Sequence, residues 1–317
     1  MIMANTSLSN AKKAKNDEFY TQLSDIENEL KHYKSHFAGK VVYCNCDDAR
    51  KSNFFRFFQK KFSDYGLKKL VTTSYNEDGH GSVLVYEGDT NGNGKFDDNE
   101  VKVSELKGNG DFRSEECIEL LKEADIVVTN PPFSLFRDYI ATLVQYDKKF
   151  LVIGNQNAIT YKEIFPLIKE NKLWTGNNMV KTFRVPQVTN KNCEILPNGD
   201  IIAKFGSICW FTNLDIKKRH EEIVLYKKYN EEEFPKYDNY NAIEVSKVCE
   251  IPKDYDGIMG VPITFLYRYN PSQFEIVGAT ESEGKGFSNG LWDKKSKDAH
   301  SLVNNKKTYK RLFIRKK

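Results

Sequence analysis

Two patterns of apolar residues alternate along roughly the first half of the chain. Short apolar runs, typical of buried strands, occur at residues 40–46, 67–76, 124–130 and 148–155. Apolar side chains recur at helical spacing at residues 25–37, 52–62, 114–124, 135–146 and 161–171, the last interrupted by Pro166. Strands and helices thus alternate in units of about 30 to 45 residues, which predicts an α/β fold built on a parallel sheet.

The pattern changes after Asn171. Short strand-like runs and turn signals follow in a region rich in Tyr and Asn, which favours a recognition region over a continued sheet. We expect a disordered N-terminus at residues 1–16, a main α/β domain at 17–215 and a smaller, irregular, strand-containing region at 216–317.

Residues 82–88 and 100–106 alternate apolar and polar positions and predict a hairpin. The turn between them, residues 89–100, matches the EF-hand calcium pattern D-x-N-x-N-G-x5-E in full. EF-hand loops have flanking helices, however, and two of the early ligands here are neutral asparagines. A polar hairpin tip explains the composition without calcium, and we favour it. Neither interpretation gives the loop a catalytic role.

Composition favours a soluble, cytoplasmic protein. No apolar run approaches the roughly 18 residues of a membrane helix, and the polar N-terminus lacks the apolar core of a secretory signal. The six cysteines form no CxxC pair, and the five histidines do not complete a ligand set with them. We therefore expect reduced thiols and no metal site.

Positive charge is concentrated at the carboxyl end. Residues 293–317 contain ten Lys or Arg and two Asp, a net charge of +8, whereas the whole chain carries +4. A basic segment on a slightly acidic body indicates contact with a polyanion. A solvated terminal segment explains the same charge equally well.

The candidate chemistry lies where the apolar run at 124–130 ends in Asn130-Pro131-Pro132-Phe133. Ligands of open α/β sheets bind at the carboxyl ends of the strands. Two prolines stiffen the segment and remove N–H donors, so that the Asn130 amide oxygen and the Pro131 carbonyl present two acceptors beside the ring of Phe133. A proline pair that only ends the strand is the simpler alternative.

Two acceptors and an aromatic ring fit an exocyclic amine on a planar heterocycle. Accepting both amine hydrogens draws the nitrogen lone pair out of the ring and makes the nitrogen nucleophilic toward a methyl sulfonium. This is catalysis by positioning, which requires neither a nucleophilic side chain nor a metal.

Beyond this motif, the sequence resembles a known family. The EcoRI-type DNA adenine-N6 methyltransferases have similar blocks in the same order, across roughly residues 15–280: DEFYTQ, KVVYCNCDDARKSNFF, GNGDFRS, DIVVTNPPFSLFRDYI, KKFLVIGN, CWFTNLD, PKYDNYNAI and GIMGVPITFLYRYNPSQFE. The resemblance implies a Rossmann-like sheet that binds S-adenosylmethionine. It also implies a carboxyl-terminal target-recognition region whose basic end contacts DNA phosphates.

The resemblance further implies cofactor-binding residues in the first two blocks. Segment 17–22 would close over the cofactor through Phe19, Tyr20 and Thr21, with an ordinary helix entry as the alternative. The loop after the first strand would hold the amino-acid end of the cofactor, although it lacks the glycine usual at this place. Its candidates are Asn45, Cys46 and Asp47, with Asp48 as the competitor of Asp47.

The cofactor's adenine and the target base would be held by later blocks. Asp111 and Phe112 would bind the cofactor's adenine, unless Asp111 only caps the following helix. The target adenine would be flipped out of duplex DNA, because its amine is out of reach inside the helix. Phe133 would stack on one face of this base and Trp210, in preference to Phe211, on the other. Strand alternation leaves the second ring of that pair in the core.

The predicted function is site-specific DNA adenine-N6 methylation from S-adenosylmethionine, as the modification arm of a restriction–modification system. A cognate restriction endonuclease would act on the same site without a stable complex. One alternative is a ribosomal RNA base or a protein glutamine amide as the substrate, since NPP[FY] serves those enzymes too. Another is a catalytically silent nucleic-acid-binding protein, against which the intact Asn130 and Phe133 argue.

Overall fold

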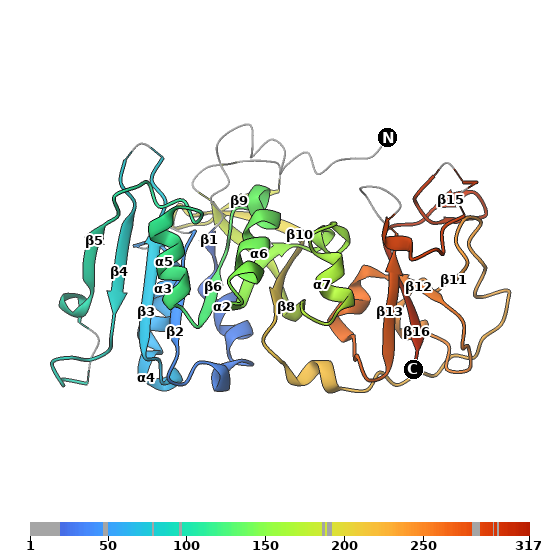
Figure 1. The fold of residues 1–317 in the computed structure, drawn as a ribbon, viewed down its shortest axis with the longest axis horizontal. Helices are drawn as coiled ribbons and strands as arrows, with labels where there is room; N and C mark the ends of the chain where they lie inside the picture. Colours follow the sequence, from blue (N-terminus) through green and yellow to red (C-terminus); the bar gives the residue numbers. More distant parts are fainter. Residues whose placement is uncertain are drawn as a thin grey trace. The chain divides into compact units, whose positions relative to one another are not determined.

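The computed structural model describes residues 20–46, 50–77, 79–94, 97–185, 188, 192–280, 286–293, 295–296 and 298–317. The chain divides into two compact units, and its course through them can be followed in Figure 1. The first unit consists of Met1–Asn155 and Gly176–Leu214, and the second of Gln156–Thr175 and Asp215–Lys317. Residues 156–175, which we placed in the main domain, therefore belong to the second unit.

The first unit is built on a mixed sheet of ten strands in the described part of the chain. Their spatial order is β1 (Tyr20–Thr21), β8 (Trp174–Val185), β10 (Ile201–Thr212), β7 (Lys149–Asn155), β6 (Ile126–Thr129), β2 (Val41–Cys44), β3 (Lys69–Ser74), β4 (Ser82–Tyr86) and β5 (Lys102–Glu105), with β9 (Cys193–Ile195) paired to β10. Strands β7, β6, β2 and β3 are parallel, as the sequence pattern predicts. The predicted hairpin is confirmed as β4 and β5.

Two helices of this unit cover opposite faces of the sheet. Phe54 of α3 (Asn53–Lys60) contacts Trp210, whereas Phe136 of α6 (Phe136–Gln145) contacts Phe211. Because neighbouring residues of a strand point to opposite faces, α3 and α6 must lie on opposite sides of β10.

The remaining helices of the first unit are short. They are α2 (Leu23–Leu30), α4 (Phe62–Tyr65) and α5 (Glu115–Glu123), with 3-10 turns at Lys34–His36, Asp98–Glu100 and Phe133–Leu135. Ser114 caps α5, since its Oγ accepts a hydrogen bond from the Cys117 N–H at 3.3 Å. None of the helices in the described part of the chain has the length and apolar character needed to span a bilayer.

The sheet extends further along the chain than the sequence pattern indicated. The expectation that no strand of the main sheet follows Asn171 was wrong, because β8 and β10 are each 12 residues long and belong to it. The polar start of β8 is held by a distant partner. The buried Glu29 carboxylate accepts the N–H groups of Asn177 at 2.7 Å and Asn178 at 2.8 Å. A contact at this sequence separation leaves no local signature.

The second unit contains a four-stranded sheet in the order β11 (Ile243–Glu244), β12 (Met259–Pro262), β16 (Arg311–Lys316) and β13 (Phe274–Ala279). A small hairpin joins β14 (Leu302–Val303) to β15 (Lys306–Lys307). Helix α7 (Phe165–Lys169) has Pro166 in its first turn, so this proline starts the helix and does not interrupt it. The 3-10 turns of this unit are Gln156–Thr160, Lys217–His220, Val248–Glu250, Ile263–Arg268 and Gly286–Ser288.

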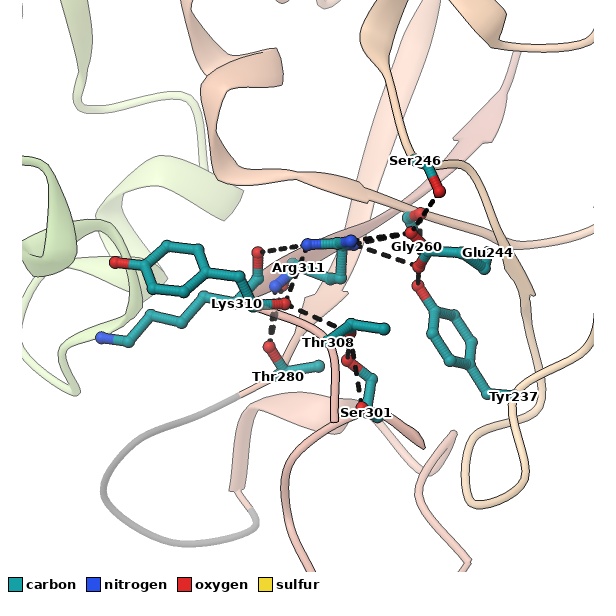
Figure 2. Close-up of polar contacts among 10 residues, drawn as sticks. Tyr237, Glu244, Ser246, Gly260, Thr280, Ser301, Thr308, Lys310 and Arg311 are labelled. Atoms are coloured by element: carbon teal, nitrogen blue, oxygen red, sulfur yellow. Dashed lines mark hydrogen bonds and ion pairs between the residues drawn. The ribbon is translucent and has the colours of Figure 1, made fainter. Parts of the chain in front are cut away.

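The basic carboxyl end forms part of this second sheet. Strand β16 pairs with β12 and β13, and its residues Leu312, Phe313 and Ile314 are fully buried. A solvated terminal segment is therefore the wrong interpretation for β16. Figure 2 shows how Arg311, at the start of the strand, is enclosed by polar partners. Its Nη2 donates to Glu244 at 2.7 Å, and its Nη1 donates to the carbonyl of Tyr309 at 2.9 Å.

Candidate active site

The carboxyl ends of β2, β3 and β6 meet at one edge of the main sheet, because these strands are parallel. Asn45 follows β2, Asn76 lies two residues beyond β3, and Asn130 follows β6. The structure thus brings the expected catalytic segment and the expected cofactor loop to the same edge, where ligands of open α/β sheets bind.

The catalytic segment leaves β6 without regular structure until Phe133 begins a 3-10 turn. Asn130 is 8% exposed and Pro131 is buried, whereas Pro132 and Phe133 are partly exposed. The helix that follows is held close to the sheet, because a Cβ atom on Gly154 would overlap the ring of Phe136. The missing side chain at Gly154 thereby allows α6, which follows the catalytic segment, to lie this close to the sheet.

We expected Phe133 and Trp210 to stack on opposite faces of one base, but their rings contact different neighbours. Phe133 meets Phe183 edge to face at 6.2 Å. Trp210 is fully buried and meets Phe54 at 6.0 Å. Of the pair 210 and 211, the residue on the α6 side is Phe211, which is fully buried as well. The stacking role of Trp210 stays a prediction, which the position of its ring does not favour.

The loop after β2 is tied to the catalytic strand through Asn45, which is 3% exposed. The Thr129 hydroxyl donates to the Asn45 carbonyl, and the Tyr139 hydroxyl donates to Asn45 Oδ1. Cys46 follows with φ of +64°, the left-handed conformation that normally selects glycine. A cysteine therefore takes the backbone shape of the glycine that this loop lacks. Asp47 and its competitor Asp48 lie outside the described residues.

The segment before α2 is a strand. Tyr20 and Thr21 form β1 and pair antiparallel with Arg184 and Phe183 of β8. The Thr21 carbonyl also accepts from Asn53 Nδ2 at 2.7 Å. Helix α2 follows at Leu23 with Gln22 as its N-cap, so the segment also leads into a helix, and its cofactor contacts stay a prediction. Phe19, the third cofactor candidate of this segment, lies outside the described residues.

Asp111 and Phe112 lie beside the end of β3. The Asn76 N–H donates to the Asn109 carbonyl at 2.8 Å, which holds the two segments together. Arg113 binds both carboxylate oxygens of Asp111, at 2.9 and 2.6 Å, and these bonds hold the Asp111 pKa below its usual value. Phe112 is 6% exposed and meets Tyr139 edge to face at 5.0 Å.

Two observations test whether this edge suits S-adenosylmethionine. Thr21 Oγ1 is buried and, within the described part of the chain, has no hydrogen-bond partner, as expected for a group whose partner is a ligand. Gly110 has φ of +84°, and a Cβ atom there would overlap the Ser74 carbonyl. Residues 110–112 therefore lie directly against the end of β3. The amide, hydroxyl, carboxylate and aromatic groups of these segments are of the kinds that the polar and adenine groups of that cofactor require.

The loop at residues 89–100 joins strands β4 and β5 and has no EF-hand helices beside it. Asp89 accepts the N–H groups of Gly92 at 2.7 Å and Gly94 at 2.6 Å, and Glu100 accepts that of Thr90 at 2.7 Å. Lys95 and Phe96 lie outside the described residues. Among the residues that are described, no group of three or more His, Cys, Asp or Glu is arranged to hold a metal. A polar tip without calcium stays our prediction.

Sequence reasoning missed two residues at this edge. Tyr139 looked like one more core position of a helix, and Phe183 fell in a region where no strand of the main sheet was expected. The available signal for Tyr139 was its hydroxyl, because a buried tyrosine needs a hydrogen-bond partner.

Known proteins resemble the chain over almost its whole length. Residues 7–317 match the family model described as adenine-specific methyltransferase EcoRI. The type II methyltransferase M.EcoRI of Escherichia coli is 52% identical over 292 residues, covering 86% of this chain and 89% of that protein. M.MgeORF184P of Mycoplasma genitalium is 42% identical over 321 residues, covering 96% and 97%. M.MpnI of Mycoplasma pneumoniae is 45% identical over 279 residues, covering 84% and 83%.

The matches confirm the resemblance seen in the sequence blocks. They include residues 130–133 and the segments at the carboxyl ends of β2, β3 and β6. The chain belongs to the family of EcoRI-type adenine-specific methyltransferases.

Proposed function

We propose that the edge formed by β2, β3 and β6 binds S-adenosylmethionine and presents its methyl group to the N6 amine of an adenine flipped out of duplex DNA. The reaction class follows from the family, because the chain is a type II, adenine-specific DNA methyltransferase of a restriction–modification system. The observation that carries the proposed site is the position of Asn130–Phe133, directly after a buried parallel strand and joined through Thr129 to the loop after β2.

The cofactor-binding residues would come from three segments of the first unit. Tyr20 and Thr21 of β1, Asn45 and Cys46 after β2, and Asp111 and Phe112 beside β3 would hold it, with Phe19 and Asp47 as further candidates. The parallel order of β7, β6, β2 and β3, with β10 antiparallel at one side, supports a Rossmann-like sheet for this purpose. Bound there, S-adenosylmethionine would supply an electrophilic methyl group.

The chain's own part in the chemistry is to orient the amine. The Asn130 amide oxygen and the Pro131 carbonyl would accept the two amine hydrogens, and Phe133 would hold the plane of the base. These interactions strengthen as the nitrogen becomes tetrahedral, so they favour the transition state over the bound substrate. Burial of Asn130 and Pro131 strengthens them further by excluding water.

The second unit would supply target recognition and contact with DNA phosphates. Part of its basic carboxyl end is used inside the protein, since Arg311 and Arg315 pair with Glu244 and Glu275. Both lysines of the β14–β15 hairpin are exposed, but Lys307 pairs with Asp298, so Lys306 is the better candidate for a phosphate contact. We place the enzyme in the cytoplasm, acting beside a cognate endonuclease without a stable complex.

One experiment separates DNA from the other substrates that this motif serves. The protein is incubated with methyl-labelled S-adenosylmethionine and, separately, with duplex DNA, ribosomal RNA and total cell protein. We expect label only in duplex DNA, recovered as N6-methyladenine. Label only in RNA or in protein would contradict the proposal.

A further inference from the structure

Tyr139 contacts residues of two segments that are proposed to bind the cofactor. It comes from α6, the helix that follows the catalytic segment, and it is 1% exposed. Its hydroxyl donates to Asn45 Oδ1, in the loop expected to hold the amino-acid end of the cofactor. Its ring meets Phe112, the residue expected at the adenine end, at 5.0 Å with the ring planes at 74°. One side chain thus joins α6 to two of the three segments proposed to bind the cofactor.

Asn45 has a second anchor that comes from the strand before the catalytic segment. The hydroxyl of Thr129, the residue directly before Asn130, donates to the Asn45 backbone carbonyl. The two hydroxyls that bind Asn45 therefore come from Thr129, before the Asn130–Phe133 segment in the chain, and from Tyr139, after it. Asn45 is therefore fixed, through its side chain and its backbone, by the two elements that position the catalytic residues.

Burial makes these bonds difficult to replace. Thr129 is fully buried and Asn45 is 3% exposed, so a lost protein partner would not be exchanged for bulk water. Burial also raises the pKa of Tyr139 well above its ordinary value, and the neighbouring Cys46 adds to this effect. The hydroxyl thus stays protonated and remains a donor at physiological pH.

A core tyrosine that merely satisfies its hydroxyl is the simpler account of the bond to Asn45. That account does not explain why the ring of the same residue contacts Phe112, more than sixty positions along the chain from Asn45. We propose that Tyr139 is a positioning residue that holds Asn45 and Phe112 in the geometry that binds S-adenosylmethionine, with Thr129 as the second anchor of Asn45. The inference rests on the proposed cofactor site.

The substitution Tyr139→Phe tests it, because it removes the hydroxyl and keeps the ring. We expect the Kd of S-adenosylmethionine, measured by calorimetry, to rise roughly tenfold, as for the loss of one hydrogen bond to a buried group. The KM for S-adenosylmethionine should rise in parallel, while kcat at saturating cofactor and the Kd of duplex DNA stay within about twofold. Thr129→Val should weaken cofactor binding in the same way, and Thr129→Ser, which keeps the hydroxyl, should restore it.

Tyr33→Phe is the matched control. Tyr33 is also fully buried in the first unit, and its hydroxyl donates to Glu29 at 2.7 Å, apart from the proposed cofactor contacts. The Tyr33→Phe variant should lose thermal stability and keep the wild-type Kd for the cofactor. A wild-type Kd in Tyr139→Phe, or an equal rise in Tyr33→Phe, would overturn the positioning role. Failure of the wild-type protein to bind S-adenosylmethionine would instead overturn the proposed cofactor site itself.

Discussion

Phe133 and Phe183 meet edge to face, with ring centroids 6.2 Å apart and ring planes at 83°. Phe183 is fully buried and lies opposite Thr21 in the pairing of β1 with β8. Phe183 therefore contacts the proposed base-stacking residue through its ring and pairs with the proposed cofactor segment through its backbone. This relationship was invisible in the sequence, where the three residues are separated by 50 positions or more.

Phe183→Leu should slow methyl transfer by about tenfold, because Phe133 loses the ring that fixes its orientation and small misplacements at a reacting centre are costly. It should also cost about 1–2 kcal/mol in the free energy of unfolding. Single-turnover kinetics and urea melts measure the two effects. Phe58→Leu, in the aromatic cluster of α3, should cost similar stability and leave the rate unchanged. Equal rates in the two variants would contradict the role given to Phe183.

Cys46 adopts a left-handed backbone that glycine accepts freely and β-branched residues resist. Cys46→Gly should therefore keep the free energy of unfolding within about 1 kcal/mol of wild type, because relief of strain offsets the greater freedom of the unfolded chain. Cys46→Val should cost more than about 1 kcal/mol. Urea melts of both variants check the order. A valine variant as stable as the glycine variant would show that the loop after β2 is not held in this conformation.

Arg311 and Glu244 form a buried ion pair in which the side chains are 10% and 7% exposed. Glu244 also accepts from the Tyr237 hydroxyl (Figure 2), and burial together with the Glu244 charge raises the pKa of Tyr237. Glu244→Gln should cost about 3–5 kcal/mol, because it leaves the Arg311 charge buried without its counter-ion.

The neighbouring pair Arg315–Glu275 is the control for this prediction, since its side chains are 50% and 47% exposed. Glu275→Gln should cost less than about 1 kcal/mol. The double variant Arg311→Met with Glu244→Leu should recover part of the loss, because it removes both charges. Thermal and urea melts measure the free energy of unfolding of these variants. Similar losses in Glu244→Gln and Glu275→Gln would contradict the prediction.

Asp298 provides a pH-dependent prediction in the second unit. Lys307 at 2.7 Å and the His300 N–H at 3.0 Å hold the Asp298 pKa well below its ordinary value of 3.8. A depressed carboxyl pKa contributes stability that is present above the unfolded value and is lost as the pH falls through the folded one. The stability advantage of wild type over Asp298→Asn should therefore be present at about pH 5 and shrink below pH 3.8. A difference that does not change across this range would refute the assignment.

The central strands and the catalytic segment were predictable because their signals are local. Strands β2 and β6 are short apolar runs between turns, and Asn130–Phe133 combines stiffness, acceptors and a ring within four residues. Strand β8 was missed because its polar start is held by Glu29, nearly 150 positions away. The burial of β16 was missed for two reasons. Counting charges gave no weight to three consecutive apolar residues of this strand, and the partner of Arg311 lies 67 positions away.

The contacts of Trp210 and Phe211 could not be predicted from the sequence either. Strand alternation correctly indicated that Trp210 and Phe211 face opposite sides, but not which side carries α6. That choice depends on the close approach of Phe136 to Gly154, which brings together two elements with no shared local pattern. Contacts of this kind appear only once the helices are placed on the sheet.

The most direct test of the proposed mechanism is Asn130→Ala, with cofactor binding and methyl transfer measured on the same preparation. The account predicts that S-adenosylmethionine binds with a Kd within about threefold of wild type, because Asn130 contacts the target amine and not the cofactor. It also predicts that N6-methyladenine formation in duplex DNA falls by a factor of about 100 or more, as when a transition-state acceptor is removed. Methyl transfer at the wild-type rate would contradict the account.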